Sequence, residues 1–263
     1  MTARHLLAEW TKVRTVPSTG WLALAIAVST VVLGAIATAS VHTSQCPSPS
    51  ECFEDTTKLA LTGVWLSQAT VVVLATLAVT TEYGTRMIQT THAAMPRRPA
   101  VLMAKAVSVS LVVLVAGTAG VLGSLVAGRI ILVGNGFTIE NGYQPLSLAD
   151  GPTLRAAAGT VLYLILVALL SLGVGALVRD TVGAITVTLT VLYLFSIAAQ
   201  LVSDPVWSER LQTYAPMPAG LAIQATTNLD RLAIQPWPGI GVLSAYAAAA
   251  VAAGVVAVKI RDV

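Results

Sequence analysis

Two long stretches without a charge, separated only by an Arg-Asp pair, decide the fold: Ala156–Val178 (AAAGTVLYLILVALLSLGVGALV) and Thr181–Ser203 (TVGAITVTLTVLYLFSIAAQLVS). An α-helix needs about 20 apolar residues to cross the roughly 30 Å hydrocarbon core of a bilayer, and each stretch supplies them. A charge at mid-depth costs about 2.5 to 3.5 kcal/mol on the insertion scale. The absence of charge from both stretches therefore indicates two consecutive membrane-spanning helices.

Four further runs have the same character. None of the 15 Lys and Arg or 12 Asp and Glu residues lies within Thr15–Ser50, Leu59–Thr81, Ala106–Gly128 or Leu232–Val258. We therefore predict an all-α integral membrane protein with a single transmembrane domain over residues 1–263. Its six predicted spans are residues 18–40, 59–81, 102–128, 155–178, 181–203 and 238–259.

The composition and the absence of motifs exclude several classes of function. Hydrophobic residues make up 56% of the chain and charged residues 10%, whereas a soluble domain is about 25% charged. The few dispersed bases do not form the basic stripe of a nucleic-acid-binding protein. The chain has no phosphate-binding Gly-Lys-Ser/Thr loop, no His-Glu-x-x-His, no Gly-x-Ser-x-Gly and no Cys/His cluster. We therefore expect no catalytic residue, metal site or cofactor in this chain. The lack of an acid inside a span also disfavours an ion-coupled carrier.

The distribution of Lys and Arg predicts that both termini are cytoplasmic. In this orientation most bases lie in inside segments, namely Arg4, Lys12, Arg14, Arg86, Arg97, Arg98, Lys105, Arg179, Lys259 and Arg261. Cys46 and Cys52 then lie outside, in a Pro/Ser-rich loop. We expect a disulfide between them, the alternative being two free thiols that are close in sequence.

Three segments outside the spans have a predicted structure. Residues 3–15 place Leu6 and Trp10 on one helical face, which predicts an amphipathic helix in the membrane interface; a frayed polar terminus is the alternative. Residues 82–98 have helical propensity up to Pro96, and a solvated loop that only sets the topology is the alternative. Residues 204–237 are interrupted by prolines but rich in apolar and aromatic groups, which predicts one or two short interfacial or re-entrant helices.

Uncharged polar groups within the spans are candidates for function. Gln68 lies near the middle of the second span, and Thr190 and Tyr193 lie in the fifth. An amide in hydrocarbon needs a partner, which is either a neighbouring helix or a wet pathway, and both alternatives stay open. Small residues at a spacing of four predict close helix contacts. They are Gly120, Ser124 and Gly128 in one span and Ala250 and Gly254 in another.

Several motifs resemble the permease subunits of ABC-2 type ABC transporters. They are Thr81–Thr91 (TEYGTRMIQTT) followed by Pro96-Arg97-Arg98 and Lys105, Glu9–Thr15 (EWTKVRT) before the first span, and Gly173–Ala184 (GVGALVRDTVGA) between the fourth and fifth. The resemblance covers the whole chain, including the six-span topology. It implies a multi-pass protein of the bacterial cell membrane, in contact with membrane lipids, that pairs with a second permease copy as a homodimer or a heterodimer.

The resemblance also implies roles for individual segments. The helix at residues 3–15 would be the elbow helix, with Leu6, Glu9, Trp10, Lys12 and Arg14. Residues 82–98 would hold the coupling helix that docks on a separate ATP-binding subunit, through Glu82, Tyr83, Thr85, Arg86, Ile88, Gln89, Thr90 and Thr91. ATP and magnesium would be bound by that partner. The first, second and fifth spans would line the translocation path, with Gln68, Thr190 and Tyr193 on it, and residues 204–237 would cap the exit.

The function expected from these features is export of a lipophilic or amphipathic substrate, such as a drug, an antibiotic or a lipid, driven by ATP in the partner subunit. A non-transporting scaffold or assembly factor that recruits a soluble partner is the main alternative. A secondary carrier is a weaker one. The sequence leaves the identity of the substrate open.

Overall fold

The computed structural model describes residues 10–11, 15–43, 55–84, 98–141, 143, 146–202 and 204–260, and these contain helices but no strand. Six helical stretches are long and apolar enough to cross a membrane, which confirms the prediction of an all-α, multi-pass membrane protein. They are α2 (Pro17–Ala39), α4 (Val64–Gly84), α6 (Arg98–Gly134), α7 (Gly151–Val178), the continuous helix formed by α8 (Thr181–Leu189), η3 (Thr190–Leu194) and α9 (Phe195–Leu201), and α12 (Pro236–Ile260).

The helices differ from the predicted spans most clearly at the second span and the third. The second span begins at Val64 rather than at residue 59, because Asp55 caps a separate short helix, α3 (Thr56–Ala60), that ends in a turn before α4. The third span is longer than predicted, since α6 begins at Arg98, with Pro99 tolerated in its first turn, and continues past the exposed Arg129 to Gly134. At 1.5 Å per residue its 37 residues extend over about 55 Å, well beyond the hydrocarbon core.

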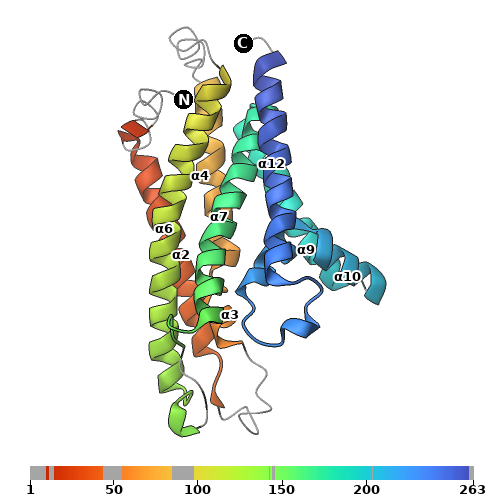
Figure 1. Cartoon of the computed structure of the whole chain (residues 1–263). Coiled ribbons are helices and arrows are strands. Elements are labelled where there is room, and N and C mark those ends of the chain that lie inside the picture. Colours follow the sequence, from red (N-terminus) through yellow and green to blue (C-terminus); the bar gives the residue numbers. More distant parts are fainter. Residues whose placement is uncertain are drawn as a thin grey trace.

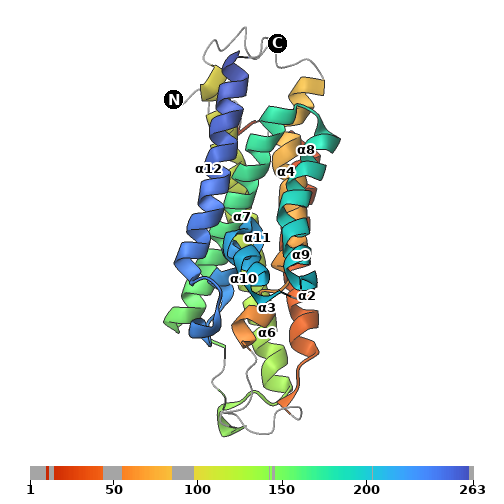
Figure 2. The same ribbon diagram turned by 90° about the vertical axis from the view of Figure 1, so that its right-hand side faces the viewer.

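The helices form an elongated bundle around α7 (Figures 1 and 2). Helix α7 packs against α4, α6, α8 and α12, and α2 packs against α6 and α4. One end of the bundle, which we call the N/C end, holds the first residues of α2 and α6. The last residues of α4 and α12 lie at the same end. The opposite end, called the loop end, holds α3 and the connection between α6 and α7.

Small residues allow the closest helix contacts, as their spacing predicts. Gly120 and Gly128 of α6 face α2, and Gly128 also meets α3. Between them, the Ser124 hydroxyl donates to the carbonyl oxygens of Ala60 (2.5 Å) and Thr30 (3.2 Å), which joins α6 to both neighbours. Such approach of backbone to backbone is the usual means by which membrane helices gain packing energy.

A second close contact joins α7 to α12. A Cβ atom on Gly173 would lie 2.4 Å from the carbonyl carbon of Ala250, and one on Gly254 would lie 3.1 Å from the carbonyl oxygen of Gly173. The predicted contact through Ala250 and Gly254 is therefore present in the structure.

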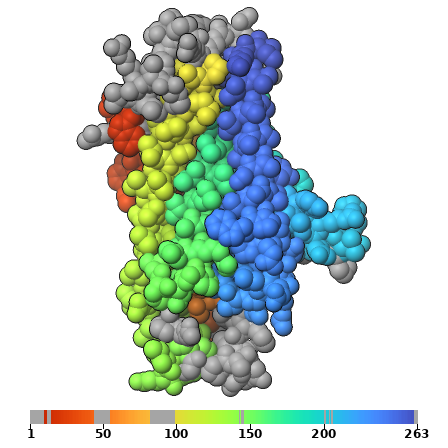
Figure 3. All heavy atoms as spheres, viewed as in Figure 1, coloured from red at the N-terminus to blue at the C-terminus, as the bar shows by residue number. Residues whose placement is uncertain are grey.

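The segment between α9 and α12 contains short helices, as predicted for residues 204–237. They are α10 (Pro205–Tyr214), α11 (Pro216–Leu221), η4 (Ala222–Gln224) and η5 (Leu229–Arg231). Helix α10 projects from the side of the bundle (Figure 3), with Arg210 placed 5.5 Å over the ring of Trp207. Helix α11 is instead buried against α12, and η4 packs against α7 and α12, so the chain returns into the bundle between the fifth and sixth spans.

Candidate functional site

A buried polar cluster joins three helices at the middle of the bundle. Gln68 of α4, Tyr163 of α7 and Met217 of α11 each have no exposed surface. The Tyr163 hydroxyl donates to Oε1 of Gln68, and Nε2 of Gln68 lies 3.3 Å from the Met217 sulfur. The amide is therefore satisfied inside the protein, as a polar group in an apolar interior must be. This arrangement is that of a helix anchor and places Gln68 away from any open surface of the single chain.

Tyr193 and Thr190, the other two residues predicted for a path, lie in the π-helical segment η3. The Tyr193 hydroxyl donates to the backbone carbonyl of Trp65, which ties the fifth span to the start of α4. The Tyr193 ring also lines an apolar groove of about 540 Å³ between α2, α4 and α8, which we call the Tyr193 groove. Its wall consists of Leu33, Ile36, Ala37, Thr62, Trp65, Leu66, Ala69, Leu189 and Tyr193. Thr190 is exposed but does not line this groove.

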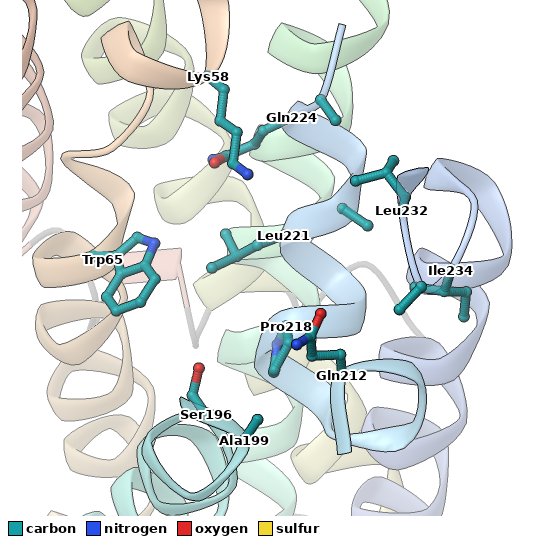
Figure 4. Close-up of a pocket in the computed structure, with 13 residues that line it drawn as sticks. Lys58, Trp65, Ser196, Ala199, Gln212, Pro218, Leu221, Gln224, Leu232 and Ile234 are labelled. Carbon is teal, nitrogen blue, oxygen red and sulfur yellow. The ribbon is translucent and has the colours of Figure 1, made fainter. Parts of the chain in front are cut away.

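A second cavity, of about 330 Å³, lies nearer the loop end and is called the Lys58 pocket (Figure 4). Its polar side chains come from four elements: Lys58 of α3, Ser196 of α9, Gln212 of α10 and Gln224 of η4. Trp65 of α4 completes it on one side. The remainder of the wall is apolar and comes mainly from α11, η4 and residues 232–234. Sequence reasoning missed this pocket because its residues are spread over six helical elements and two loop segments and share no motif.

At the loop end, beside this pocket, the carboxylate of Asp55 joins α3 to the chain that follows η4. Asp55 caps α3 by accepting from the Lys58 N–H (3.0 Å). The same carboxylate accepts from the Thr226 N–H (2.5 Å), the Thr226 hydroxyl (2.7 Å) and the Thr227 N–H (3.2 Å). Arg155 of α7 donates to the carbonyl of Ala225 at 2.6 Å. The chain that leaves η4 is thus held against both α3 and α7.

The N/C end contains a link between the second and fifth spans. Helix α7 ends at Val178, and the left-handed conformation of the next residue, Arg179 (φ 60°), turns the chain. Asp180 then caps α8 by accepting from the Gly183 N–H at 2.7 Å. This short turn brings the Thr181 hydroxyl within 2.7 Å of the Thr80 hydroxyl, one turn before the end of α4. This hydrogen bond joins the end of α4 to the turn between α7 and α8.

Most of the predicted docking and elbow residues lie outside the described residues. The backbone of Glu82 and Tyr83 forms part of the last turn of α4. Trp10 has a helical backbone, and its side chain is partly exposed. The other docking and elbow residues are not described, and these are Leu6, Glu9, Lys12, Arg14, Thr85, Arg86, Ile88, Gln89, Thr90 and Thr91. Cys46 and Cys52 are also outside the described part, so their pairing stays a prediction. Within the described residues no group of three or more His, Cys, Asp and Glu side chains is placed to hold a metal ion.

Comparison with known proteins identifies no relative of this chain. No protein-family model, no curated protein and no solved structure matches it.

Proposed function

We propose that this protein is the permease subunit of an ATP-driven exporter of the ABC-2 type, and that a separate ATP-binding subunit supplies the energy. The observation that carries the proposal is the position of α4. This helix contacts α2, α6, α7 and α8, and at its N/C end it is bonded to the turn between α7 and α8 through Thr80 and Thr181. A force applied to the segment after Gly84 would therefore reach most of the bundle.

In the proposed mechanism, residues 82–98 dock on the ATP-binding subunit and Glu82 takes part in the contact. Closure of two ATP-binding subunits around ATP and magnesium would move each docked segment. Because packed helices are stiff, α4 would pass this displacement to α8 through the Thr80–Thr181 hydrogen bond. The chain then needs no catalytic group of its own, since ATP hydrolysis takes place in the partner.

The Tyr193 groove supports a path along the first, second and fifth spans. Its walls come from α2, α4 and the α8–η3 helix, and they are almost entirely apolar, which suits a lipophilic or amphipathic substrate. In the proposal a second permease copy, identical or different, closes this face. In this arrangement Tyr193 lines the path. Thr190, which is exposed outside the groove, would face the path at its edge or from the second copy. Gln68 reaches it only after the buried cluster opens.

The N/C end is proposed to be cytoplasmic in a bacterial cell membrane. The Lys and Arg bias of the sequence supports this orientation. The segment from α10 to η5 then lies on the outer side, where it would cap the exit, with Trp207 and Tyr214 of α10 at the depth of the lipid head groups.

Copurification tests the proposal most directly. The full chain, expressed in its native host and purified in mild detergent, is expected to carry an ATP-binding subunit that mass spectrometry identifies. Glu82→Ala and Arg86→Ala should reduce ATP-driven efflux in reconstituted vesicles while the chain still assembles. If no such subunit copurifies and neither substitution affects efflux, the proposal is wrong. Retention of a soluble partner without transport would favour a scaffold, and transport that needs an ion gradient but no ATP would favour a secondary carrier.

A further inference from the structure

The Lys58 pocket and the Tyr193 groove share one lining side chain, that of Trp65. Its side chain is 43% exposed, and the two cavities are therefore neighbours on either side of one tryptophan. On one side of it lie Leu33, Leu66 and the other apolar residues of the groove. On the other side lies the Lys58 pocket, where Lys58 and Gln224 supply polar groups at one end of a mainly apolar lining (Figure 4). A molecule that occupied both cavities would therefore need an apolar part and a polar part joined at the position of Trp65.

The polar side chains of the pocket favour one sign of charge. Lys58 is the only ionic side chain among the described residues that line it, and none of these residues is acidic. The nearest carboxylate in sequence, that of Asp55, already accepts four hydrogen bonds from the backbone of α3 and from Thr226 and Thr227. Lys58 and Gln224 lie together at one end of the pocket (Figure 4). The Gln224 amide nitrogen already donates to the Thr160 hydroxyl (3.3 Å) and keeps one further N–H, so Lys58 is the main donor at this end.

The size of the pocket limits what it can hold. Its volume of about 330 Å³ is at the lower end of the roughly 300 to 1,000 Å³ found for pockets that take a whole drug-sized molecule. It suits a compact head group with its first methylene groups. The adjoining groove, at about 540 Å³, has room for an apolar chain.

We propose that these two cavities form one binding site for a single-chain amphiphile with an anionic head group, the head lying beside Lys58 and the chain passing Trp65 into the Tyr193 groove. The inference rests on the proposed function, because it makes this amphiphile the class of cargo that the exporter carries. It identifies Lys58 as the residue that selects the charge. A carboxylate, a sulfonate or a phosphate would fit the same chemistry.

Fluorescence of Trp65 gives a direct test. The chain has five tryptophans, and a variant that keeps Trp65 alone places the reporter between the two cavities. The other four, Trp10, Trp21, Trp207 and Trp237, are replaced by Phe. A brominated dodecyl sulfonate is titrated into the purified protein in detergent, and it is expected to quench Trp65 with a saturable curve. Brominated dodecanol, which has the same chain and no charge, should bind about tenfold more weakly, since it lacks a charge-assisted hydrogen bond to Lys58.

Substitutions distinguish binding of the amphiphile at a defined site from its unspecific partitioning. Lys58→Gln should weaken sulfonate binding about tenfold and leave dodecanol unchanged, whereas Lys58→Arg should keep the affinity because it keeps the charge. Lys259→Gln removes an exposed lysine at the N/C end of α12 and is the matched control, with no change expected. Ala233→Phe fills the pocket from a half-buried loop position and should abolish saturable quenching without altering the charge. Circular dichroism and gel filtration establish that each variant is folded.

The results that would overturn this inference differ from those that would overturn the exporter. Linear quenching, or equal affinity for the sulfonate in the parent and in the folded Lys58→Gln variant, would show that the site does not exist. If Lys58 governs binding but no ATP-driven transport occurs, the binding site stands and the exporter is refuted. If ATP-driven efflux of the sulfonate occurs and Lys58→Gln changes neither efflux nor binding, the exporter stands and this inference is wrong.

Discussion

The hydrogen bond between Tyr163 and Gln68 leads to the sharpest prediction about stability. Both side chains are completely buried, so water cannot replace a partner that is removed. Tyr163→Phe takes away the hydroxyl and leaves Oε1 of Gln68 without a donor. Gln68→Leu removes the acceptor and leaves the Tyr163 hydroxyl inside an apolar core. Each single substitution is expected to destabilise the protein.

The size of the effect follows from the burial. A buried polar group left without a partner costs about 1 to 3 kcal/mol in soluble proteins. Hydrogen bonds between membrane helices average about 0.6 kcal/mol, with a maximum near 1.7, because the unfolded helices also find partners. We expect about 1.5 kcal/mol for each single variant, since the cluster is fully enclosed by protein. For a chain of this size that corresponds to a decrease in Tm of about 3 to 6 °C.

The double variant Gln68→Leu/Tyr163→Phe distinguishes an anchor from simple packing. It replaces both polar partners by apolar groups of similar shape, so its cost should be smaller than the sum of the two single costs by about 1 to 2 kcal/mol. The assay is thermal unfolding of the detergent-purified protein, followed by size-exclusion chromatography with fluorescence detection. Tyr246→Phe is the matched control, because Tyr246 is 40% exposed on α12, and no change is expected. Single effects that add within about 0.5 kcal/mol would refute the reasoning.

Three further predictions concern other contacts. Gly173→Ala should lower Tm by more than 5 °C, as its Cβ would lie 2.4 Å from the backbone of α12, whereas Gly241→Ala, where nothing lies within 4 Å of the added Cβ, should be neutral or stabilise by about 0.5 to 1 kcal/mol. Asp55→Asn should accelerate hydrogen exchange at the Thr226 amide about tenfold, because it weakens a charge-assisted hydrogen bond; unchanged exchange would contradict this contact. Thr181→Val should leave assembly intact but reduce ATP-driven efflux relative to ATP hydrolysis; unchanged efflux per ATP would exclude this route of coupling.

The sequence predicted the spans well because each span is a local property. The charge-free runs Ala156–Val178 and Thr181–Ser203 lie within or close to two helices of the structure, which meet at the Arg-Asp pair, although α7 begins earlier, at Gly151. The start of α4 was wrong, since Asp55 forms a helix cap that hydropathy does not detect. Helix α6 continues beyond the predicted span at 102–128, because an exposed arginine does not stop a helix that extends past the hydrocarbon.

The candidate sites were less predictable. Gln68 was recognised as a polar group that needs a partner, but Tyr163 is 95 residues away in sequence and Met217 lies 149 residues away, so neither partner could be named. The Lys58 pocket gave no signal at all. The spacing of small residues did predict close contacts, although it did not say which helix each glycine would meet.

The sequence by itself determined how many helices cross the membrane and where the charges lie, because the bilayer imposes its free-energy cost on each residue separately along the chain. Only the tertiary structure decided which helix faces another helix and which faces lipid. The spans are apolar on all sides, and lipid tails are as apolar as Leu, so no hydrophobic periodicity distinguishes a buried face from an exposed one. The enclosure of Gln68 and the position of Trp65 in the lining of two cavities depend on shape and on long-range contacts. Both features therefore follow from the packing of the helices and not from any local stretch of sequence.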